Sequence, residues 1–135
     1  MKIVADTGLL VALVNADDRH HDWAEQVVRQ ADLPLLTCEP VLSEAVFHLR
    51  SADPLLAMLE NDDIAVAFEV ASHVAYLRQL ALRYGDRAPD LADLCLIRMS
   101  ELYPRHVVAT VDESDFRVYR RNKREAIPLL CPPHR

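Results

Sequence analysis

Glycine is scarce in this sequence, with only two among 135 residues. All-β sandwiches and barrels need many turns, and this scarcity argues against them. The three cysteines, Cys38, Cys95 and Cys131, are far apart and form no Cys-x-x-Cys pair. Neither a disulfide framework nor a zinc knuckle is therefore expected, and we expect unreactive thiols in a reducing cytosol.

Long apolar runs are also missing. No run approaches the roughly 20 residues that a transmembrane helix needs. The apolar N-terminal segment is interrupted by Asp6, has only Lys2 as a basic residue before it, and is followed by no Ala-x-Ala cleavage site. It therefore does not resemble a signal peptide. We expect a cytoplasmic protein with one domain over residues 1–135 and no membrane partner.

The net charge is negative, because 15 Lys and Arg face 21 Asp and Glu, which gives −6. Proteins that bind nucleic acid only through phosphate contacts are usually basic. An acidic protein can still act on RNA if its acids hold a metal ion and its bases line the approach. The distribution of charge along the chain therefore matters more than its sum.

The spacing of apolar residues predicts alternating strands and helices. Expected strands cover residues 2–5, 35–37, 64–70, 107–111 and 127–130, and expected helices cover 9–14, 19–31, 40–50, 53–60, 72–84, 90–103 and 114–121. Thr7 and Gly8 are expected to break the chain between the first strand and the first helix. The alternation predicts an α/β sandwich with a mainly parallel sheet.

Four acidic residues stand at positions where such a fold forms binding sites. Asp6 follows the first expected strand and Asp112 follows the fourth, and sites in open parallel sheets form at the carboxyl ends of strands. Glu44 and Asp93 lie on helices that must pack on the same sheet. Asp93 lies inside an almost wholly apolar helix, where an unpaired carboxylate is energetically costly. We therefore expect the four acids to converge.

Four carboxylates in one cleft repel one another, and one would stay protonated unless a cation is bound. Oxygen ligands suit Mg²⁺ or Mn²⁺, and the lack of a His or Cys partner argues against zinc. Such an ion activates water and neutralises charge on a phosphodiester. Other interpretations stay open, because Asp6 and Asp112 can be turn residues and Asp90 and Asp115 can be helix N-caps.

Four short segments resemble, in order and spacing, those of PIN domains, and in particular those of VapC-like toxins of bacterial type II toxin–antitoxin pairs. They are residues 3–7 (Ile-Val-Ala-Asp-Thr), 40–45 (Pro-Val-Leu-Ser-Glu-Ala), 90–94 (Asp-Leu-Ala-Asp-Leu) and 109–116 (Ala-Thr-Val-Asp-Glu-Ser-Asp-Phe). Residues 117–120 and 127–130 also resemble one branch of that family. The likeness covers nearly the whole chain.

The resemblance implies a three-layer α/β/α sandwich that acts as an endoribonuclease with Mg²⁺ or Mn²⁺ as its cofactor. The implied metal ligands are Asp6, Glu44, Asp93 and Asp112, with Asp115 as an acid that only some members use, and the implied supporting residues are Thr7 and Thr110. The implied partners are an RNA substrate, an inhibiting antitoxin protein, and a second copy of the chain in a homodimer.

A basic run follows Asp112 in the sequence. It consists of Arg117, Arg120, Arg121, Lys123 and Arg124. Phosphate contacts from these side chains would steer RNA towards the acids, whereas the alternative is a solvated face with salt bridges to the protein's own acids. His48 lies one helical turn after Glu44, a spacing that allows a hydrogen bond.

Two further functions stay open. One is a housekeeping PIN nuclease of RNA maturation or decay, which the sequence does not separate from a toxin. The other is a non-catalytic module that binds a partner through its acidic face. Phosphotransfer domains of the haloacid type are excluded, because they need a second Asp two residues after the first, where Gly8 stands.

Overall fold

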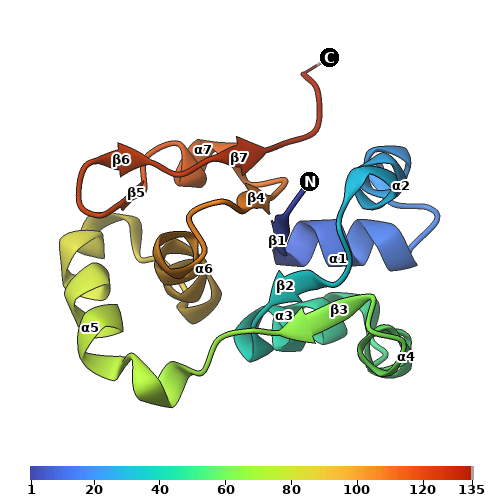
Figure 1. Cartoon of the computed structure of the whole chain (residues 1–135), viewed down its shortest axis with the longest axis horizontal. Helices are drawn as coiled ribbons and strands as arrows, with labels where there is room; N and C mark the ends of the chain where they lie inside the picture. The colour runs from blue at the N-terminus through green and yellow to red at the C-terminus, as the bar shows by residue number, and fades with distance from the viewer. Residues whose placement is uncertain (135) are drawn as a thin grey trace.

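The computed structural model describes residues 1–134 and contains a five-stranded parallel sheet (Figure 1). The strand order is β3-β2-β1-β4-β7. The strands are β1 (Ile3–Ala5), β2 (Leu35–Thr37), β3 (Ile64–Val66), β4 (Val107–Ala109) and β7 (Leu129–Leu130). Because β1 pairs in parallel with both β2 and β4, the carboxyl ends of these three strands meet at one edge of the sheet.

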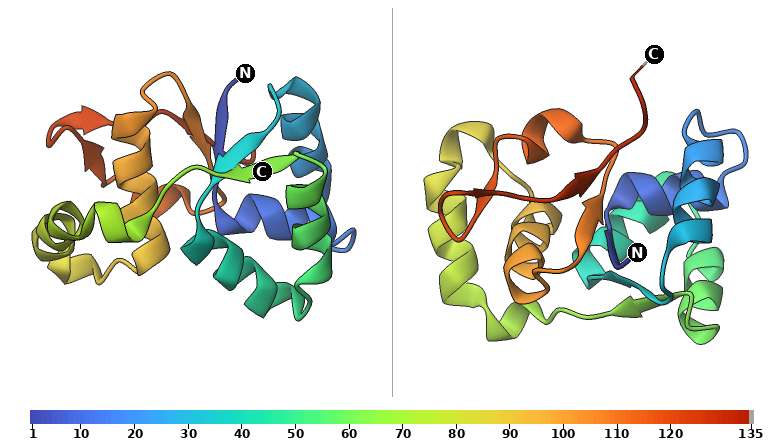
Figure 2. Two further views of the ribbon diagram at one scale, coloured as in Figure 1. Left: turned by 60° about the horizontal axis from the view of Figure 1, so that its bottom comes forward. Right: turned by 45° about the horizontal axis from the view of Figure 1, so that its top comes forward.

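Helices cover both faces of the sheet. They are α1 (Thr7–Val14), α2 (His21–Gln30), α3 (Glu39–Leu49), α4 (Asp53–Glu60), α5 (Val74–Arg83), α6 (Leu91–Leu102) and α7 (Glu113–Phe116), with two 3₁₀ helices, η1 (Val70–Ser72) and η2 (Gly85–Arg87). Figure 1 shows α1, α2 and α4 on one side of the strands and α5 and α6 on the other, and the views in Figure 2 agree. The predicted three-layer α/β/α sandwich is therefore confirmed.

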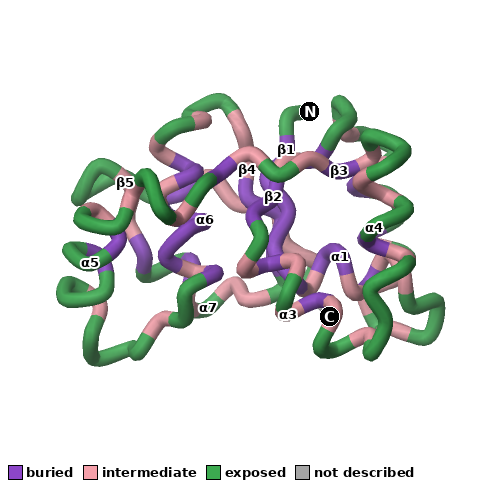
Figure 3. The backbone as a smooth tube through the Cα atoms, turned by 90° about the horizontal axis from the view of Figure 1, so that it is seen from below, coloured by how far each residue is buried: buried purple, intermediate pink, exposed green. Residues whose placement is uncertain are grey.

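The core centres on the middle strands and on α6, as the burial colouring in Figure 3 shows. All three residues of β1 are fully buried. The buried residues of α6 are Ala92, Leu94, Cys95, Leu96, Ile97, Met99 and Ser100. This helix contacts both β1 and β4, which explains why its sequence leaves almost no polar face.

Two further observations concern the described part of the chain. No helix among residues 1–134 is long and apolar enough to cross a bilayer. The three cysteines are all free, two of them buried and one half-buried, so no disulfide supports the fold.

The first strand passes into α1 without the expected break. The helix begins at Thr7, and Asp6 is its N-cap. A Cβ added at Gly8 would overlap the side chain of Val111. Glycine is therefore required here for α1 to lie close to the loop that carries Asp112.

The strand expected over residues 64–70 is too long. It ends at Val66, because β3 is an edge strand whose only neighbour, β2, ends at Thr37. The backbone N–H of Ala67 still donates to the Thr37 carbonyl at 2.9 Å, but the residues beyond it have no strand to pair with. The strands expected over 107–111 and 127–130 are shorter as well, since they pair only over the three residues of β4 and the two of β7.

The helix expected over residues 114–121 is wrong beyond Phe116, where α7 ends. A hairpin follows, in which β5 (Arg120–Arg121) pairs antiparallel with β6 (Glu125–Ala126). Tyr119 is buried, and the N–H of Arg120 donates to the Tyr84 hydroxyl at 2.9 Å. These tertiary contacts outweigh the local helical preference.

Truncation of Leu96 to alanine tests the placement of α6 in the core. Leu96 is fully buried, so Leu96→Ala leaves a cavity and is expected to lower the free energy of unfolding by about 2–5 kcal/mol. The control is Leu82→Ala on α5, where the side chain is 79% exposed, and there the expected loss is below about 0.5 kcal/mol. Urea unfolding measures both free energies, and equal losses for the two variants would contradict the placement of Leu96 in the core.

Candidate metal centre

A cleft of about 460 Å³ opens at the carboxyl edge of the sheet. Its lining contains the four predicted metal ligands, Asp6, Glu44, Asp93 and Asp112, together with Thr7, Gly8, Val11, Asp18, His20, His48, Asp90 and Val111. The four acids come from the end of β1, the middle of α3, the first turn of α6 and the loop after β4. A larger groove of about 1240 Å³ between α3 and η1 contains only Glu44 of these four.

Asp6 is the most deeply buried of these acids, at 7% exposure. Its Oδ1 accepts the backbone N–H of Thr7 at 2.7 Å, and its Oδ2 accepts the hydroxyl of Thr110 at 2.6 Å. Burial raises the pKa of Asp6 above its ordinary value, and these two hydrogen bonds oppose the rise. The Thr110 hydroxyl oxygen also accepts the N–H of Asp112 at 3.0 Å, so one threonine positions two acids.

Asp93 lies in the first turn of α6, where its backbone N–H donates to Oδ1 of the N-cap Asp90 at 2.8 Å. The Tyr119 hydroxyl donates to Asp93 Oδ2 at 3.0 Å. Burial, and then the charge of Asp90, raise the pKa of Asp93 to about 7, while the bond from Tyr119 lowers it. When no cation is bound, this carboxyl group therefore keeps its proton to a much higher pH than an ordinary aspartate does.

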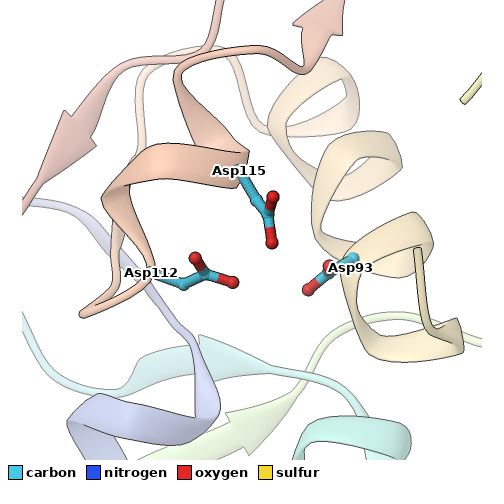
Figure 4. A group of neighbouring side chains, drawn as sticks. All are labelled: Asp93, Asp112 and Asp115. Carbon is cyan, nitrogen blue, oxygen red and sulfur yellow. The ribbon is translucent and has the colours of Figure 1, made fainter. Parts of the chain in front are cut away.

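Asp112 and Asp115 complete a second set of acids with Asp93. Carboxylate oxygens of the three lie within 4.8 Å of one another, and Figure 4 shows the side chains pointing towards one another from α6 and from α7 with its preceding loop. Burial, and then the charge of Asp115, raise the pKa of Asp112. Asp115 also accepts a hydrogen bond from Nη1 of Arg87 at 2.7 Å.

Glu44 reaches the cleft from α3. The Thr7 hydroxyl donates to Glu44 Oε2 at 3.0 Å. Burial raises the pKa of Glu44, and the neighbouring Asp90 carboxyl raises it further through a hydrogen bond and its charge. His48 lines the same cleft, but no hydrogen bond joins it to Glu44 among the interactions of residues 1–134.

Three residues at the site were not predicted as functional. Asp90 is the N-cap that the sequence allows, but it also lines the cleft. Its three-residue spacing to Asp93 indicates a place in the site, because this spacing puts both residues on one side of a helix. Tyr119 and Arg87 carry no such signal, because their contacts with Asp93 and Asp115 bring together residues 26 and 28 positions apart.

The basic run is not brought to the cleft, whose lining contains none of its members. Arg117 pairs with Glu113, and Arg120 donates to backbone carbonyls. Arg121 pairs with Glu125 and donates to the carbonyls of Ser100 and Pro104, at the far end of α6 from Asp93. The remaining two members, Lys123 and Arg124, are exposed in the hairpin turn.

The acidic side chains of the cleft fit a hard divalent cation, and His20 and His48 line it as well. All the acidic side chains offer oxygen, which Mg²⁺ and Mn²⁺ prefer. The raised pKa values of Asp6, Glu44, Asp93 and Asp112 show that their negative charges are unfavourable in the folded chain without a cation. A bound divalent ion would offset both the burial of these charges and their mutual repulsion.

The raised pKa of Asp93 predicts a pH dependence of stability. The folded chain binds the proton of the Asp93 carboxyl group more tightly than the unfolded chain does. The stability that this proton contributes is fully present below about pH 4 and is lost as the pH rises through about 7. In EDTA, the melting temperature is expected to fall between these pH values by more in the wild type than in Asp93→Asn. If the melting temperatures of the two proteins changed equally with pH, the raised pKa of Asp93 would be contradicted.

A scan against models of protein families matches residues 3–122 to the PIN domain. No curated protein matches the chain closely enough to count as a relative. The matched region spans β1 to β5 and contains every acid of the cleft. The sheet order, the three layers and this match agree: the chain belongs to the PIN domain family.

Proposed function

We propose that this protein is an endoribonuclease that depends on Mg²⁺ or Mn²⁺. PIN domains are generally nucleases, so phosphodiester hydrolysis is the chemistry that the family supports. The proposal rests on one observation: Asp6, Glu44, Asp93 and Asp112 line a single cleft, and each has a raised pKa. Acids that repel one another alone form a favourable site around a cation.

A metal ion in this cleft would activate water and neutralise charge on the scissile phosphodiester. The protein's own residues hold its ligands in place. Thr110 fixes Asp6 Oδ2 and Tyr119 fixes Asp93 Oδ2, whereas Asp93 Oδ1 accepts no hydrogen bond from residues 1–134. We assign this oxygen to the metal, because a carboxylate held at one oxygen presents the other in a fixed direction.

Thr7 joins the two acids on the other side of the cleft. Its N–H donates to Asp6 and its hydroxyl donates to Glu44. The start of α1 therefore sets the distance between the end of β1 and α3. In this proposal Thr7 orients Asp6 and Glu44, two of the residues that would hold the metal.

We further propose that the nuclease is the toxin of a toxin–antitoxin pair, with an antitoxin protein and a second copy of the chain as partners. The support is the resemblance of its four segments to VapC-like toxins. Expression of the chain is then expected to arrest growth, and co-expression of the neighbouring gene to relieve it. Normal growth at a confirmed level of active protein would instead favour a housekeeping nuclease.

Metal-dependent cleavage is the direct test of the site. Purified protein is expected to cut RNA internally with Mn²⁺ or Mg²⁺ and to lose this activity in excess EDTA. Asp93→Asn and Asp112→Asn each remove a ligand charge and are expected to lower the cleavage rate about 100-fold or more. Gel analysis of a mixed pool of tRNA, rRNA and mRNA measures the rate.

A matched control is Asp62→Asn, at an exposed turn with positive φ of 59° that asparagine also adopts. It is expected to keep full activity. Saturating Mn²⁺ is expected to raise the melting temperature of this control as it does for the wild type, since only the folded state binds the ion. Full activity in excess chelator, or no thermal shift with Mn²⁺, would refute the metal mechanism and favour a non-catalytic acidic module.

A further inference from the structure

The acids at the carboxyl edge of the sheet have very little positive charge beside them. They are Asp6, Glu44, Asp90, Asp93, Asp112 and Asp115. Within residues 1–134, one salt bridge joins a basic side chain to any of these six, and it is the pair between Arg87 Nη1 and Asp115 Oδ1 at 2.7 Å. An RNA strand that approaches these six acids therefore meets electrostatic repulsion, which a bound metal and Arg87 would reduce.

Arg87 is placed to meet a ligand from solvent. It ends η2, and its side chain is 40% exposed. The hydrogen bond to Asp115 uses one of the five N–H donors of the Arg87 side chain. This side chain forms no other hydrogen bond within residues 1–134. A guanidinium group with free donors in a fixed fork matches the oxygens of a phosphate.

Asp115 differs from the other acids of its set. Asp93 and Asp112 line the cleft, whereas Asp115 does not. Its oxygen lies within 4.8 Å of theirs, but it is already paired with Arg87. The Asp115 carboxyl group therefore lies between the Arg87 guanidinium and the two acids that we assign to the metal, Asp93 and Asp112.

We propose that Arg87 binds a phosphate of the RNA beside the metal centre, and that Asp115 holds Arg87 in position and is not itself a metal ligand. This inference rests on the proposed nuclease function. It gives the acidic edge a phosphate contact that the basic run does not supply, because no member of that run lines the cleft.

Equilibrium binding of RNA tests the role of Arg87. The probe is a fluorescent single-stranded RNA with phosphorothioate linkages that slow cleavage, read by anisotropy in Mg²⁺. Arg87→Gln is expected to raise the dissociation constant about tenfold, and Arg87→Lys by less, because lysine keeps the charge but not the fork. For Arg87→Gln, the slope of log K against log salt is expected to become shallower by about 0.7, the loss of one single-strand phosphate contact.

The control is Arg105→Gln, which removes the same charge from an exposed residue just before β4, at the opposite edge of the sheet. Its dissociation constant is expected to stay within twofold of the wild type. If Arg87→Gln behaves like Arg105→Gln, or weakens binding without a change in the salt slope, Arg87 does not bind phosphate and the proposal fails.

Calorimetric titration with Mn²⁺ tests the role of Asp115. Asp112→Asn is expected to raise the Mn²⁺ dissociation constant at least tenfold, whereas Asp115→Asn is expected to change it less than threefold. The alternative is that Asp115 is a metal ligand and that Arg87 only occupies the place of the ion. In that case Asp115→Asn would raise the Mn²⁺ dissociation constant as much as Asp112→Asn does, and Arg87→Gln would lower it. That pattern overturns the proposal while leaving the nuclease function intact; a wild type that binds no Mn²⁺ overturns both.

Discussion

Carboxyl groups that must share a small, partly dry space are the constraint on which the rest of this structure depends. Neutral groups donate hydrogen bonds to these acids and partly offset their repulsion. The donors are the hydroxyls of Thr7, Thr110 and Tyr119, and the backbone N–H of Thr7. The bond from Thr110 to Asp6 joins residues 104 positions apart. It is possible only because β4 pairs with β1 in parallel, in register from Ile3 to Ala5.

Fold and site are built from the same elements. α6 fills the core with its middle residues and presents Asp93 in its first turn, while its N-cap Asp90 both satisfies that turn and lines the cleft. The tyrosine that fixes Asp93 is itself buried against Tyr84 and Phe116. Packing of the helical layer on this side of the sheet therefore determines the direction of the Asp93 carboxylate.

Much of this arrangement was predictable from the sequence, because strand ends and helix periodicity are local signals. Asp6 and Asp112 were placed correctly by the apolar runs that precede them, and the burial of α6 by its lack of a polar face. The early end of β3 depends on the length of its neighbour, and the hairpin after α7 depends on contacts of Tyr119 and Arg120 with distant residues. The contact between Arg87 and Asp115 is of the same non-local kind.

The connection between β3 and α5 divides the acids into two groups. Asp6 and Glu44 precede it, whereas Asp93 and Asp112 follow it. The polypeptide crosses here from one side of the sheet to the other, through a segment in which Glu69, Ala71 and Ser72 are exposed and Phe68 is buried. A proteolytic nick in this stretch would leave the four acids divided between two fragments, and only the pairing of β1 with β4 would hold the cleft together. The cleft is therefore assembled from two separate stretches of the chain, and its acids come together only when β1 and β4 pair.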